Sequence, residues 1–335
     1  MFVLESANDL FGLNQPDEKI EVVVTEKMSS GQIVKLLETK GVVKKPLTFR
    51  LYAGFKKALD KFKPGSYVLN SNMSYDEIIM LLKAGDTTIQ TTSVTFYEGM
   101  TTWEIAKRLE ENNVCSAQEF VDVLNTADFS SYEFVGMIPE EELRYQKLEG
   151  YLFPDTYEFY IDDSPERVAK KFFNNFQNKI SDELLDRMKD LNLTLYETLT
   201  FASVVQGEAG QIDEMKRVAS VFWNRFESDG AYPRMESDVT RDYVNYFIKP
   251  YLNITNQDMY DAYNTYVCEG LPVAPVNNPG IDAIRATLYP DETPYNFFVT
   301  DINGKFYYSV TFQEHSKKVA EARKVGKTHG IALPD

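Results

Sequence analysis

LTLYETLTFASVVQGEAGQIDEMKRVASVFWNRF, residues 193–226, is the stretch that decides how the larger part of this chain folds. Residues 193–210 carry apolar side chains at helical spacing, and residues 213–226 repeat an amphipathic helical pattern. Four side chains of the first segment fall at positions i, i+3, i+4 and i+7: Phe201, Val204, Val205 and Glu208. The stretch predicts two consecutive helices, the first with one carboxyl group on an apolar stripe.

Glu208 is the candidate catalytic residue in this pattern. Burying a carboxylate without a partner is costly and favours its protonated form, so the position suits a proton donor near neutral pH. The alternative is that Glu208 rotates to the helix end and is solvated beside Gly210. Both interpretations stay open on the pattern alone, and the loops on either side of the two helices favour the first.

The first of these loops is EGYLFPDTYEF, residues 149–159, in which Pro154-Asp155 forces a turn among four aromatic residues. Aromatic faces can stack on sugar rings, and carboxylates can accept hydrogen bonds from sugar hydroxyls. The same composition fits a core-packed loop whose tyrosines bury their rings and hydrogen-bond their hydroxyls. The composition does not separate a ligand loop from a packed one.

The second loop is YNTYVCEGLPVAPVNNPG, residues 263–280, whose proline and glycine content predicts a rigid, irregular wall. Asn277 and Asn278 precede a predicted helix and could cap it. The better ligand candidates stand at the start of the loop: Tyr263, Asn264 and Tyr266.

The amino-terminal part predicts a separate small module. IEVVVTE (residues 20–26) reads as a strand, SSGQIVKLLETKGV as a capped helix, Pro46 to Phe62 as an amphipathic stretch, SYVLN as a strand and MSYDEIIMLLKAGD as a second capped helix. Residues 20 to about 87 therefore predict a compact βααβα-like module, with a domain boundary near residues 86–93.

The rest of the chain predicts helices that alternate with irregular loops. TTIQTTSVTFYEG (residues 87–99) is strand-like, and FFVTDINGKFYYS reads as a hairpin that turns at Asn303-Gly304. The predicted fold class is α+β, with a small amino-terminal module and a larger, mixed and mainly helical domain.

Composition excludes several classes of partner. The chain has 335 residues, 43% of them apolar, which is enough for about two domains. A net charge of −16, from 51 acidic and 35 basic residues, argues against binding DNA or RNA and indicates a solvated surface. Two distant cysteines, Cys115 and Cys268, and two histidines, His315 and His329, predict neither a disulfide framework nor a metal site.

The sequence shows no membrane segment. It contains no run of eighteen apolar residues, and its start lacks the basic and apolar regions of a signal peptide. Taken literally, this predicts a soluble cytoplasmic protein, although an ectodomain whose anchor has been removed has the same appearance.

The chain resembles the membrane-anchored endolytic murein transglycosylases, the YceG-like family, over nearly its whole length. The resemblance is carried by KFKPGSYVL, VTFYEGMTTWEIA, EGYLFPDTYEF, ASVVQGEA, KRVASVFWNR, the MESD segment, AYNTYVCEGLP followed by NNPG, and FFVTDINGKFYYSVTFQEH. It implies a segment 1–19 that follows a removed anchor, a LysM-like glycan-binding module at 20–90 and a catalytic domain at 91–335.

The resemblance also implies a function. It predicts a lytic transglycosylase that cleaves the MurNAc-GlcNAc bond of peptidoglycan strands with Glu208 as acid and base, closes a 1,6-anhydro ring, and terminates or trims nascent chains without a cofactor. Cell-wall synthesis proteins are expected partners, and a single-pass anchor would hold the catalytic domain outside the cell membrane. The residues expected to position the glycan are Glu149, Asp155, Tyr157, Glu236, Asp238, Tyr263 and Asn264.

The chain departs from the family pattern near the predicted site. Gln206 and Gly207 stand where the family usually has Glu and Lys, residues 236–240 read ESDVT in place of QTDPT, and Val273-Ala274 replaces Pro-Gly. Two alternatives therefore remain: a non-catalytic peptidoglycan-binding scaffold, and a hydrolase that pairs Glu208 with Glu236 or Asp238.

Overall fold

The computed structural model describes residues 9–12, 18–85, 91–252 and 255–328 of the chain. The chain divides into two compact units, residues 1–90 and residues 91–335. Most of the predicted segment 1–19 and the first residues of the predicted strand 87–99 lie outside the described residues. No helix in the part described is long and apolar enough to cross a membrane.

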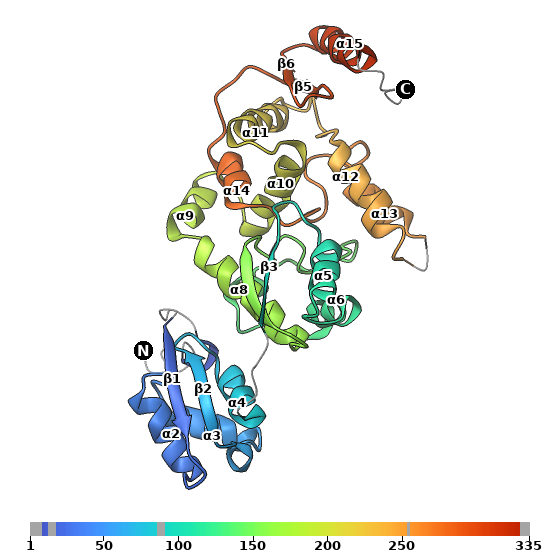
Figure 1. Ribbon diagram of the computed structural model, residues 1–335. Helices are drawn as coiled ribbons and strands as arrows, with labels where there is room; N and C mark the ends of the chain where they lie inside the picture. Colours follow the sequence, from blue (N-terminus) through green and yellow to red (C-terminus); the bar gives the residue numbers. More distant parts are fainter. Residues whose placement is uncertain (1–8, 13–17, 86–90, 253–254, 329–335) are drawn as a thin grey trace. The chain divides into compact units, whose positions relative to one another are not determined.

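The first unit is built on one antiparallel strand pair (Figure 1). Its elements are β1 (Lys19–Val24), α2 (Ser30–Thr39), α3 (Pro46–Phe55), the 3-10 turn η1 (Leu59–Lys61), β2 (Gly65–Asn70) and α4 (Tyr75–Ala84). This β-α-α-β-α order agrees with the sequence prediction. The strands pair from Lys19 opposite Asn70 to Val24 opposite Gly65, and alternate residues of each strand are buried. Capping boxes at Ser29 and Ser74 begin α2 and α4.

The second unit is mainly helical and contains two antiparallel strand pairs among the described residues. The predicted α+β class is therefore confirmed. Its described elements are β3 (Thr91–Thr95), α5 (Thr102–Glu111), α6 (Ala117–Thr126), α7 (Glu133–Gly136), β4 (Thr156–Tyr160), α8 (Pro165–Lys179), α9 (Asp182–Asp190), α10 (Leu195–Glu208), α11 (Ile212–Phe226), α12 (Asp238–Tyr243), the π-helical turn η2 (Val244–Ile248), α13 (Gln257–Tyr263), α14 (Ile281–Leu288), β5 (Phe297–Thr300), β6 (Phe306–Ser309) and α15 (Phe312–Thr328).

The second half of the aromatic stretch 149–159 is a strand and not a loop. Strand β4 pairs antiparallel with β3, from Thr91 opposite Tyr160 to Thr95 opposite Thr156. Phe159 is fully buried, and its ring lies 5.9 Å from that of Phe172 on α8. The core-packed alternative therefore describes these aromatic residues, because the strand needs an apolar face against the helices behind it.

Helix α10 lies at the centre of the second unit (Figure 1). Every residue from Thr198 to Val205 is buried, and the helix contacts α9, α11, α12 and α14. The sequence predicted that α10 has one apolar face, but the helix is buried on all sides because other helices pack around it. The sequence still fixes where it begins, with a capping box formed by Thr194 and Glu197.

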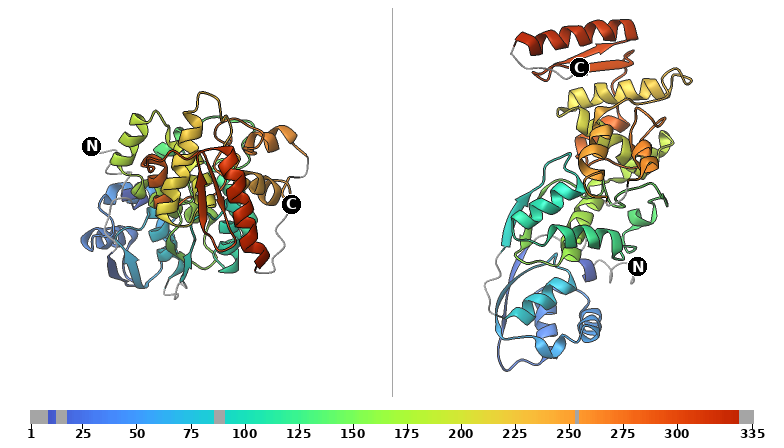
Figure 2. Two further views of the ribbon diagram at one scale, coloured as in Figure 1. Left: turned by 90° about the horizontal axis from the view of Figure 1, so that it is seen from above. Right: turned by 90° about the vertical axis from the view of Figure 1, so that its right-hand side faces the viewer.

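The carboxyl-terminal hairpin agrees with the sequence prediction. Strands β5 and β6 pair antiparallel, from Phe297 opposite Ser309 to Thr300 opposite Phe306. Gly304 takes a positive φ of 78° in the turn, a conformation that glycine adopts without the steric cost of a Cβ. Helix α15 packs against both strands of this hairpin (Figure 2).

Candidate active site

Glu208 ends helix α10 and is half-buried. The Oγ of Ser237 donates a hydrogen bond of 2.5 Å to its Oε1 atom. Three residues earlier on the helix, Val205 is fully buried. The carboxyl group thus stands where a buried helix meets the surface, so that it is partly desolvated and still accessible.

The surroundings of Glu208 raise the pKa of its carboxyl group to about 7. Burial is the largest cause, while the hydrogen bond from Ser237 lowers the pKa and the nearby charge of Asp238 raises it. Arg225 lowers the pKa and Asp242 raises it. The carboxyl end of a helix also disfavours a negative charge. Glu208 can therefore give up and take back a proton near neutral pH.

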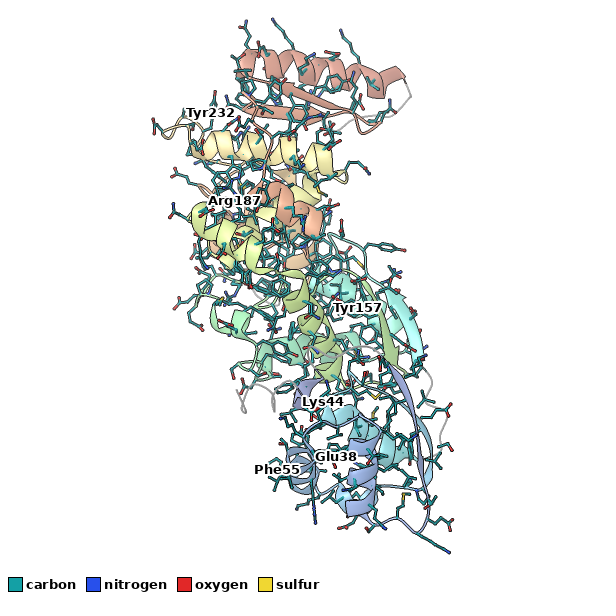
Figure 3. All side chains as sticks on the ribbon, turned by 90° about the vertical axis from the view of Figure 1, so that its left-hand side faces the viewer. Glu38, Lys44, Phe55, Tyr157, Arg187 and Tyr232 are labelled. Carbon is teal, nitrogen blue, oxygen red and sulfur yellow. The ribbon has the colours of Figure 1, made fainter. Side chains whose placement is uncertain are left out.

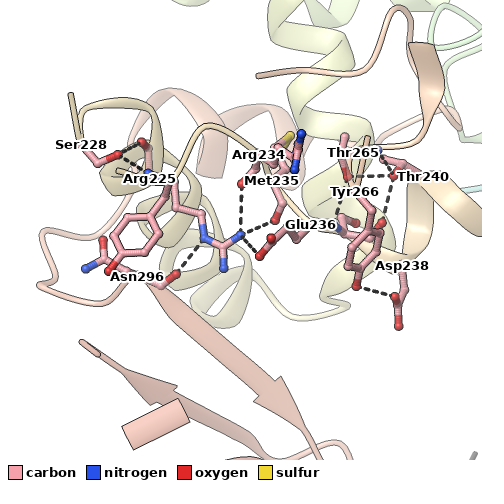
Figure 4. Close-up of polar contacts among 12 residues, drawn as sticks. Arg225, Ser228, Arg234, Met235, Glu236, Asp238, Thr240, Thr265, Tyr266 and Asn296 are labelled. Atoms are coloured by element: carbon pink, nitrogen blue, oxygen red, sulfur yellow. Dashed lines mark hydrogen bonds and ion pairs between the residues drawn. The ribbon is translucent and has the colours of Figure 1, made fainter. Parts of the chain in front are cut away.

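Thr265 fixes the position of Ser237. The Ser237 amide donates to Thr265 Oγ1 at 3.0 Å, and Thr265 Oγ1 lies 2.9 Å from Thr240 Oγ1. The Thr240 hydroxyl also lies 2.9 Å from the Ser237 carbonyl oxygen, and the Glu236 amide donates to the Thr265 carbonyl at 3.1 Å. Figure 4 labels Thr265, Thr240 and Glu236 in this network. Because Ser237, Thr240 and Thr265 are buried, Ser237 has little freedom to move away from Glu208.

Arg225, on helix α11, holds the segment just before Ser237. It is buried, and it donates hydrogen bonds to the carbonyl oxygens of Met235 at 2.6 Å and Asn296 at 2.8 Å (Figure 4). Its Nη1 atom lies 3.3 Å from the carboxylate of Glu236. Glu236 has a left-handed backbone with φ of 55°, a conformation that costs a non-glycine residue about 1–2 kcal/mol. The contacts of Arg225 offset that cost.

Charged and aromatic side chains lie exposed beside Glu208. Tyr266 donates a hydrogen bond of 2.7 Å to Asp238, and Arg241 forms an ion pair of 3.1 Å with the same carboxylate. The guanidinium of Arg241 lies 5.6 Å from the centre of the Tyr266 ring. The side chains of Asp238 and Arg241 are 61% and 46% exposed, so this group can reach a ligand from solvent.

Glu149, in contrast, is 1% exposed and has only internal partners in the described structure. Its Oε1 atom accepts hydrogen bonds from the Thr102 amide at 2.8 Å, the Thr102 hydroxyl at 3.0 Å and Asn278 at 2.8 Å. The hydroxyl of Tyr243 donates to Oε2 at 2.9 Å. Tyr243 ends helix α12, the helix that begins just after Ser237. Glu149 therefore joins four segments of the second unit instead of facing outward.

Burial raises the pKa of Glu149 to about 7, while the hydrogen bonds from Tyr243 and Thr102 lower it. Asn278 also accepts hydrogen bonds from the amides of Gly150 at 2.9 Å and Leu152 at 2.8 Å. It does not cap α14, whose first turn follows Gly280 without a side-chain cap. The burial of these polar groups is tolerated because nearly all of their hydrogen bonds are made.

The other predicted site residues are divided between surface and interior. Tyr263 is fully buried, and its hydroxyl accepts from the Tyr145 amide at 3.0 Å. Asn264 follows helix α13 and accepts from the Tyr266 amide at 3.1 Å. It thereby shapes the turn that carries Tyr266.

Asp155 and Tyr157 are joined to each other through Asn175, which donates to both, at 3.1 Å and 2.8 Å. Asp155 is half-exposed and lies 3.2 Å from the Nζ atom of Lys179. Tyr157, shown in Figure 3, is buried and donates to the Phe153 carbonyl at 2.6 Å. Among the described residues, no hydrogen bond or ion pair joins this pair to Glu208, whereas Glu236 and Asp238 flank its partner Ser237.

Two of the departures from the family pattern lie against each other. A Cβ atom on Gly207 would come within 2.4 Å of Val239 Cγ1, so the end of α10 packs directly on the start of α12. Gln206 accepts from the Gly280 amide at 3.0 Å. A Cβ atom on Gly280 would overlap the carboxyl group of Glu98, so a larger residue at this position would require the Glu98 side chain to move. Gly207 and Val239 thus pack on each other directly beside Glu208, and Gln206 holds the residue that precedes α14.

Sequence reasoning missed the residues that hold Glu208. Ser237 appeared only as a departure from a pattern, Arg225 only as a letter in the KRVASVFWNR motif, and Thr265 only as a loop residue. The role of Arg225 could have been anticipated from the sequence. An arginine among buried residues of a helix needs several hydrogen-bond acceptors, so its position predicts contacts with backbone carbonyls or carboxylates. The hydrogen bond between Ser237 and Glu208 joins positions 29 residues apart, and no local sequence pattern predicts it.

Replacing Ser237 by Ala is expected to raise the pKa of Glu208 further, because the hydrogen bond from Ser237 favours the ionised carboxylate. A shift of about one pH unit corresponds to the loss of one hydrogen bond to a charged group. Carbon-detected NMR titration of glutamate-labelled protein measures it, with Glu208→Gln to assign the signal. Ser237→Thr keeps the hydroxyl and should titrate as the wild type does. An unchanged or lowered pKa in Ser237→Ala would contradict the role of this contact.

The described residues contain no group of three or more His, Cys, Asp or Glu side chains that could hold a metal ion. Both cysteines are free thiols in the structure, and burial raises the pKa of Cys115 to about 12. A thiol with such a pKa stays protonated at neutral pH and is a poor nucleophile. In the described part of the chain, the titratable group at the centre of the site is the carboxyl group of Glu208, which accepts a hydrogen bond from Ser237.

Comparisons with known proteins agree on one family. The YceG-like family matches residues 22–321 of the chain. A Bacillus subtilis protein named endolytic murein transglycosylase is 28% identical over 316 residues, which cover 91% of this chain and 86% of that protein. A Streptococcus pneumoniae protein of the same name is 28% identical over 326 residues, covering 90% of this chain and 58% of that longer protein. A crystal structure of a YceG-like protein from Listeria monocytogenes is similar with a TM-score of 0.58 and 27% identity, covering 90% of this chain and 99% of that one.

Proposed function

This chain belongs to the YceG-like family, and from that premise we propose that it is a peptidoglycan lytic transglycosylase whose single acid and base is Glu208. The predicted enzyme class is confirmed by relatives named endolytic murein transglycosylases. The names of the relatives also favour cleavage within strands. The reaction product and the residue roles are our proposals.

In the proposed reaction, Glu208 first acts as an acid. It donates its proton to the bridging oxygen between MurNAc and GlcNAc as the bond from that oxygen to the MurNAc C1 breaks. The ionised Glu208 then removes the proton of the MurNAc C6 hydroxyl, whose oxygen attacks C1 and closes a 1,6-anhydro ring. Glu208 ends the cycle protonated, and no water is consumed. One carboxyl group is enough because the nucleophile belongs to the substrate.

The observation that carries this proposal is the half-buried carboxyl group of Glu208, whose pKa is raised to about 7. An acid with this pKa is protonated in a large fraction of molecules at neutral pH, and its conjugate base is strong enough to accept a proton. Ser237 supports the first half of the cycle, since its hydroxyl donates to the carboxylate that forms when Glu208 gives up its proton.

We propose that the remaining predicted residues either contact the glycan or hold the site and its loops in shape. Asp238 and Glu236 flank Ser237 and are exposed, so we assign them, with Tyr266, to contacts with the glycan. Glu149 and Tyr263 are buried and are proposed to hold the walls of the site in place. Asp155, Tyr157 and Asn264 are assigned to shaping the loops on either side.

We also propose a role for the first unit and a cellular location for the enzyme. The β-α-α-β core of the first unit supports a LysM-like module that binds the glycan strand. Because the substrate lies outside the cytoplasmic membrane, we propose that the enzyme works there, attached by an anchor that precedes this chain. Terminating or trimming nascent strands, together with cell-wall synthesis proteins, is the proposed role.

The nature of the product tests the proposal directly. Digestion of purified, unlabelled peptidoglycan strands is expected to give fragments that end in 1,6-anhydro-MurNAc. Mass spectrometry identifies them, because an anhydro end is lighter than a reducing end by one water molecule. Digestion in ¹⁸O-labelled water should leave the fragment masses unchanged, since no water enters the proposed reaction.

Two other outcomes would each support a different function. Reducing ends that carry ¹⁸O would identify a two-carboxylate hydrolase, in which Glu236 or Asp238 assists Glu208. Strand binding without any cleavage, under conditions in which the Bacillus relative is active, would favour the scaffold alternative. Either result would overturn the transglycosylase mechanism.

A further inference from the structure

Helix α3 of the first unit exposes a row of large apolar side chains. Leu47, Leu51 and Phe55 are spaced four residues apart and therefore lie along one face of the helix. Leu47 and Leu51 are each 77% exposed and Phe55 is 84% exposed. Phe49 and Ala53, on the opposite face, are fully buried in the core of the unit. The helix therefore has a normal buried face and a second apolar face toward solvent.

This row, Leu47, Leu51 and Phe55, is called the α3 row below. Figure 3 shows Phe55 on the outer side of the first unit. Single exposed apolar residues are common in soluble proteins, but three large ones in line on a ten-residue helix form a patch that needs a partner. The sequence pattern alone gives no way to tell which of the two apolar faces is buried.

The segment that carries the α3 row is basic. Residues 44–63 contain seven lysines and arginines and a single acidic residue, Asp60. Arg50, Lys57 and Lys61 are exposed. The nearby carboxylate of Asp76 is already engaged, by an ion pair of 3.3 Å with Lys56 and a hydrogen bond of 2.7 Å from Tyr52. The segment that carries the row therefore has a net positive charge.

The cationic character is local, because the chain as a whole has a net charge of −16. Residues 1–90 contain 12 basic and 11 acidic residues, so the negative excess belongs to residues 91–335. An apolar helical face with a cationic border, in an otherwise acidic protein, is complementary to a surface that is apolar inside and negatively charged outside.

We propose that α3 lies on the surface of an anionic lipid bilayer, with the α3 row inserted between the acyl chains and the surrounding lysines and arginine at the lipid phosphates. A soluble anionic polymer would engage the cations but would leave the apolar row in water. A second copy of this chain would bring two cationic borders against each other. The lipid surface satisfies both features at once.

Flotation of the full 335-residue chain with lipid vesicles tests this inference. Vesicles that contain phosphatidylglycerol should carry the protein upward in a density gradient, whereas vesicles of phosphatidylcholine alone should not. Leu51→Ser combined with Phe55→Ser is expected to lower the partition coefficient at least about tenfold. Each of Arg50→Gln, Lys57→Gln and Lys61→Gln is expected to lower it by about fivefold and to weaken its dependence on salt.

Matched controls separate lipid docking from unfolding. Tyr246→Ser removes a residue of the second unit that is 66% exposed, and it should float as the wild type does. Circular dichroism should show unchanged helix content in every variant, because the altered side chains point into solvent. Flotation that is absent in the wild type, or that survives Leu51→Ser with Phe55→Ser, would overturn the proposal.

Two further measurements test the alternatives to lipid, which are an anionic polymer or a second copy of the chain bound at the α3 row. Binding to soluble polyphosphate that depends on the basic residues but not on the α3 row would assign the surface to an anionic polymer. Light scattering that shows a dimer of the wild type and a monomer of the double serine variant would assign it to a second copy of the chain. Both results would contradict docking to lipid. None of these tests depends on the enzymatic proposal, because none measures glycan cleavage.

Discussion

Glu208→Gln is expected to reduce the cleavage of peptidoglycan strands by about a hundredfold to ten-thousandfold, the usual contribution of one general acid or base. Glutamine keeps the size of the side chain and can still accept the hydrogen bond from Ser237, so the geometry of the site should persist. It has no proton to give to the bridging oxygen. Cleavage rates on purified strands, followed by the appearance of anhydro ends, measure the loss.

The control for this experiment is Glu236→Gln, which neutralises an exposed carboxylate close to Ser237. It removes an ion pair with Arg225 but no proposed proton donor, so it should affect the Michaelis constant more than the turnover number. If Glu208→Gln folds normally and cleaves at the wild-type rate, the assignment of Glu208 is wrong. A loss of turnover in Glu236→Gln as large as that in Glu208→Gln would favour the two-carboxylate mechanism.

Glu208→Gln should not destabilise the fold at neutral pH. The pKa of Glu208 is raised to about 7 in the folded protein from its usual value of 4.5. The folded state therefore holds this proton more tightly than the unfolded state, and stability falls as the pH rises from 4.5 to 7. The glutamine variant has no carboxyl group at this position, so its stability does not fall for this reason as the pH rises. Inactivity together with unchanged or slightly higher stability would thus distinguish a chemical role from a structural one.

Glu149→Ala is expected to lower the free energy of unfolding of the second unit by about 3–5 kcal/mol, a large fraction of the stability of a typical domain. The substitution leaves the Thr102 amide, the Asn278 amide group and the Tyr243 hydroxyl without their buried acceptor. Both tryptophans, Trp103 and Trp223, lie in the second unit, so fluorescence during urea unfolding reports on this unit alone.

Glu149→Gln is the matched variant and should be far milder. Its carbonyl oxygen can accept from Thr102 and Asn278, and its amino group can donate to the Tyr243 hydroxyl. Burial raises the pKa of Glu149 to about 7, so its own contribution to stability also falls as the pH rises from 4.5 to 7. The difference in stability between pH 5 and pH 7.5 should therefore shrink in Glu149→Gln. Equal stability of the alanine variant and the wild type would show that the network contributes nothing.

The sequence determined the elements and their class, because these depend on local patterns. Capping boxes at Ser29, Ser74 and Thr194 fix where three helices begin, and Asn303-Gly304 fixes the hairpin. Each of these signals involves residues that are at most a few positions apart. The sequence also singled out Glu208, since a carboxyl group at the end of an otherwise apolar helix stands out without knowledge of any neighbour.

The tertiary structure alone decided which side chains face each other. Glu149 and Tyr157 carry groups that suit a sugar, and composition could not tell that both are buried and satisfied internally. Ser237 reaches Glu208 across 29 residues only because Thr265 and Arg225 hold its segment against the end of α10. Long-range contacts of this kind depend on how helices pack, and side-chain packing leaves no periodic trace in the chain.

The same distinction applies to helix α3. Its sequence shows two apolar faces, one with Phe49 and Ala53 and one with Leu47, Leu51 and Phe55, and both satisfy the helical spacing. Only the packing of the first unit decides that the smaller face is covered and the larger one meets solvent. Periodicity reports which residues share a face, whereas burial depends on what the rest of the chain brings against it.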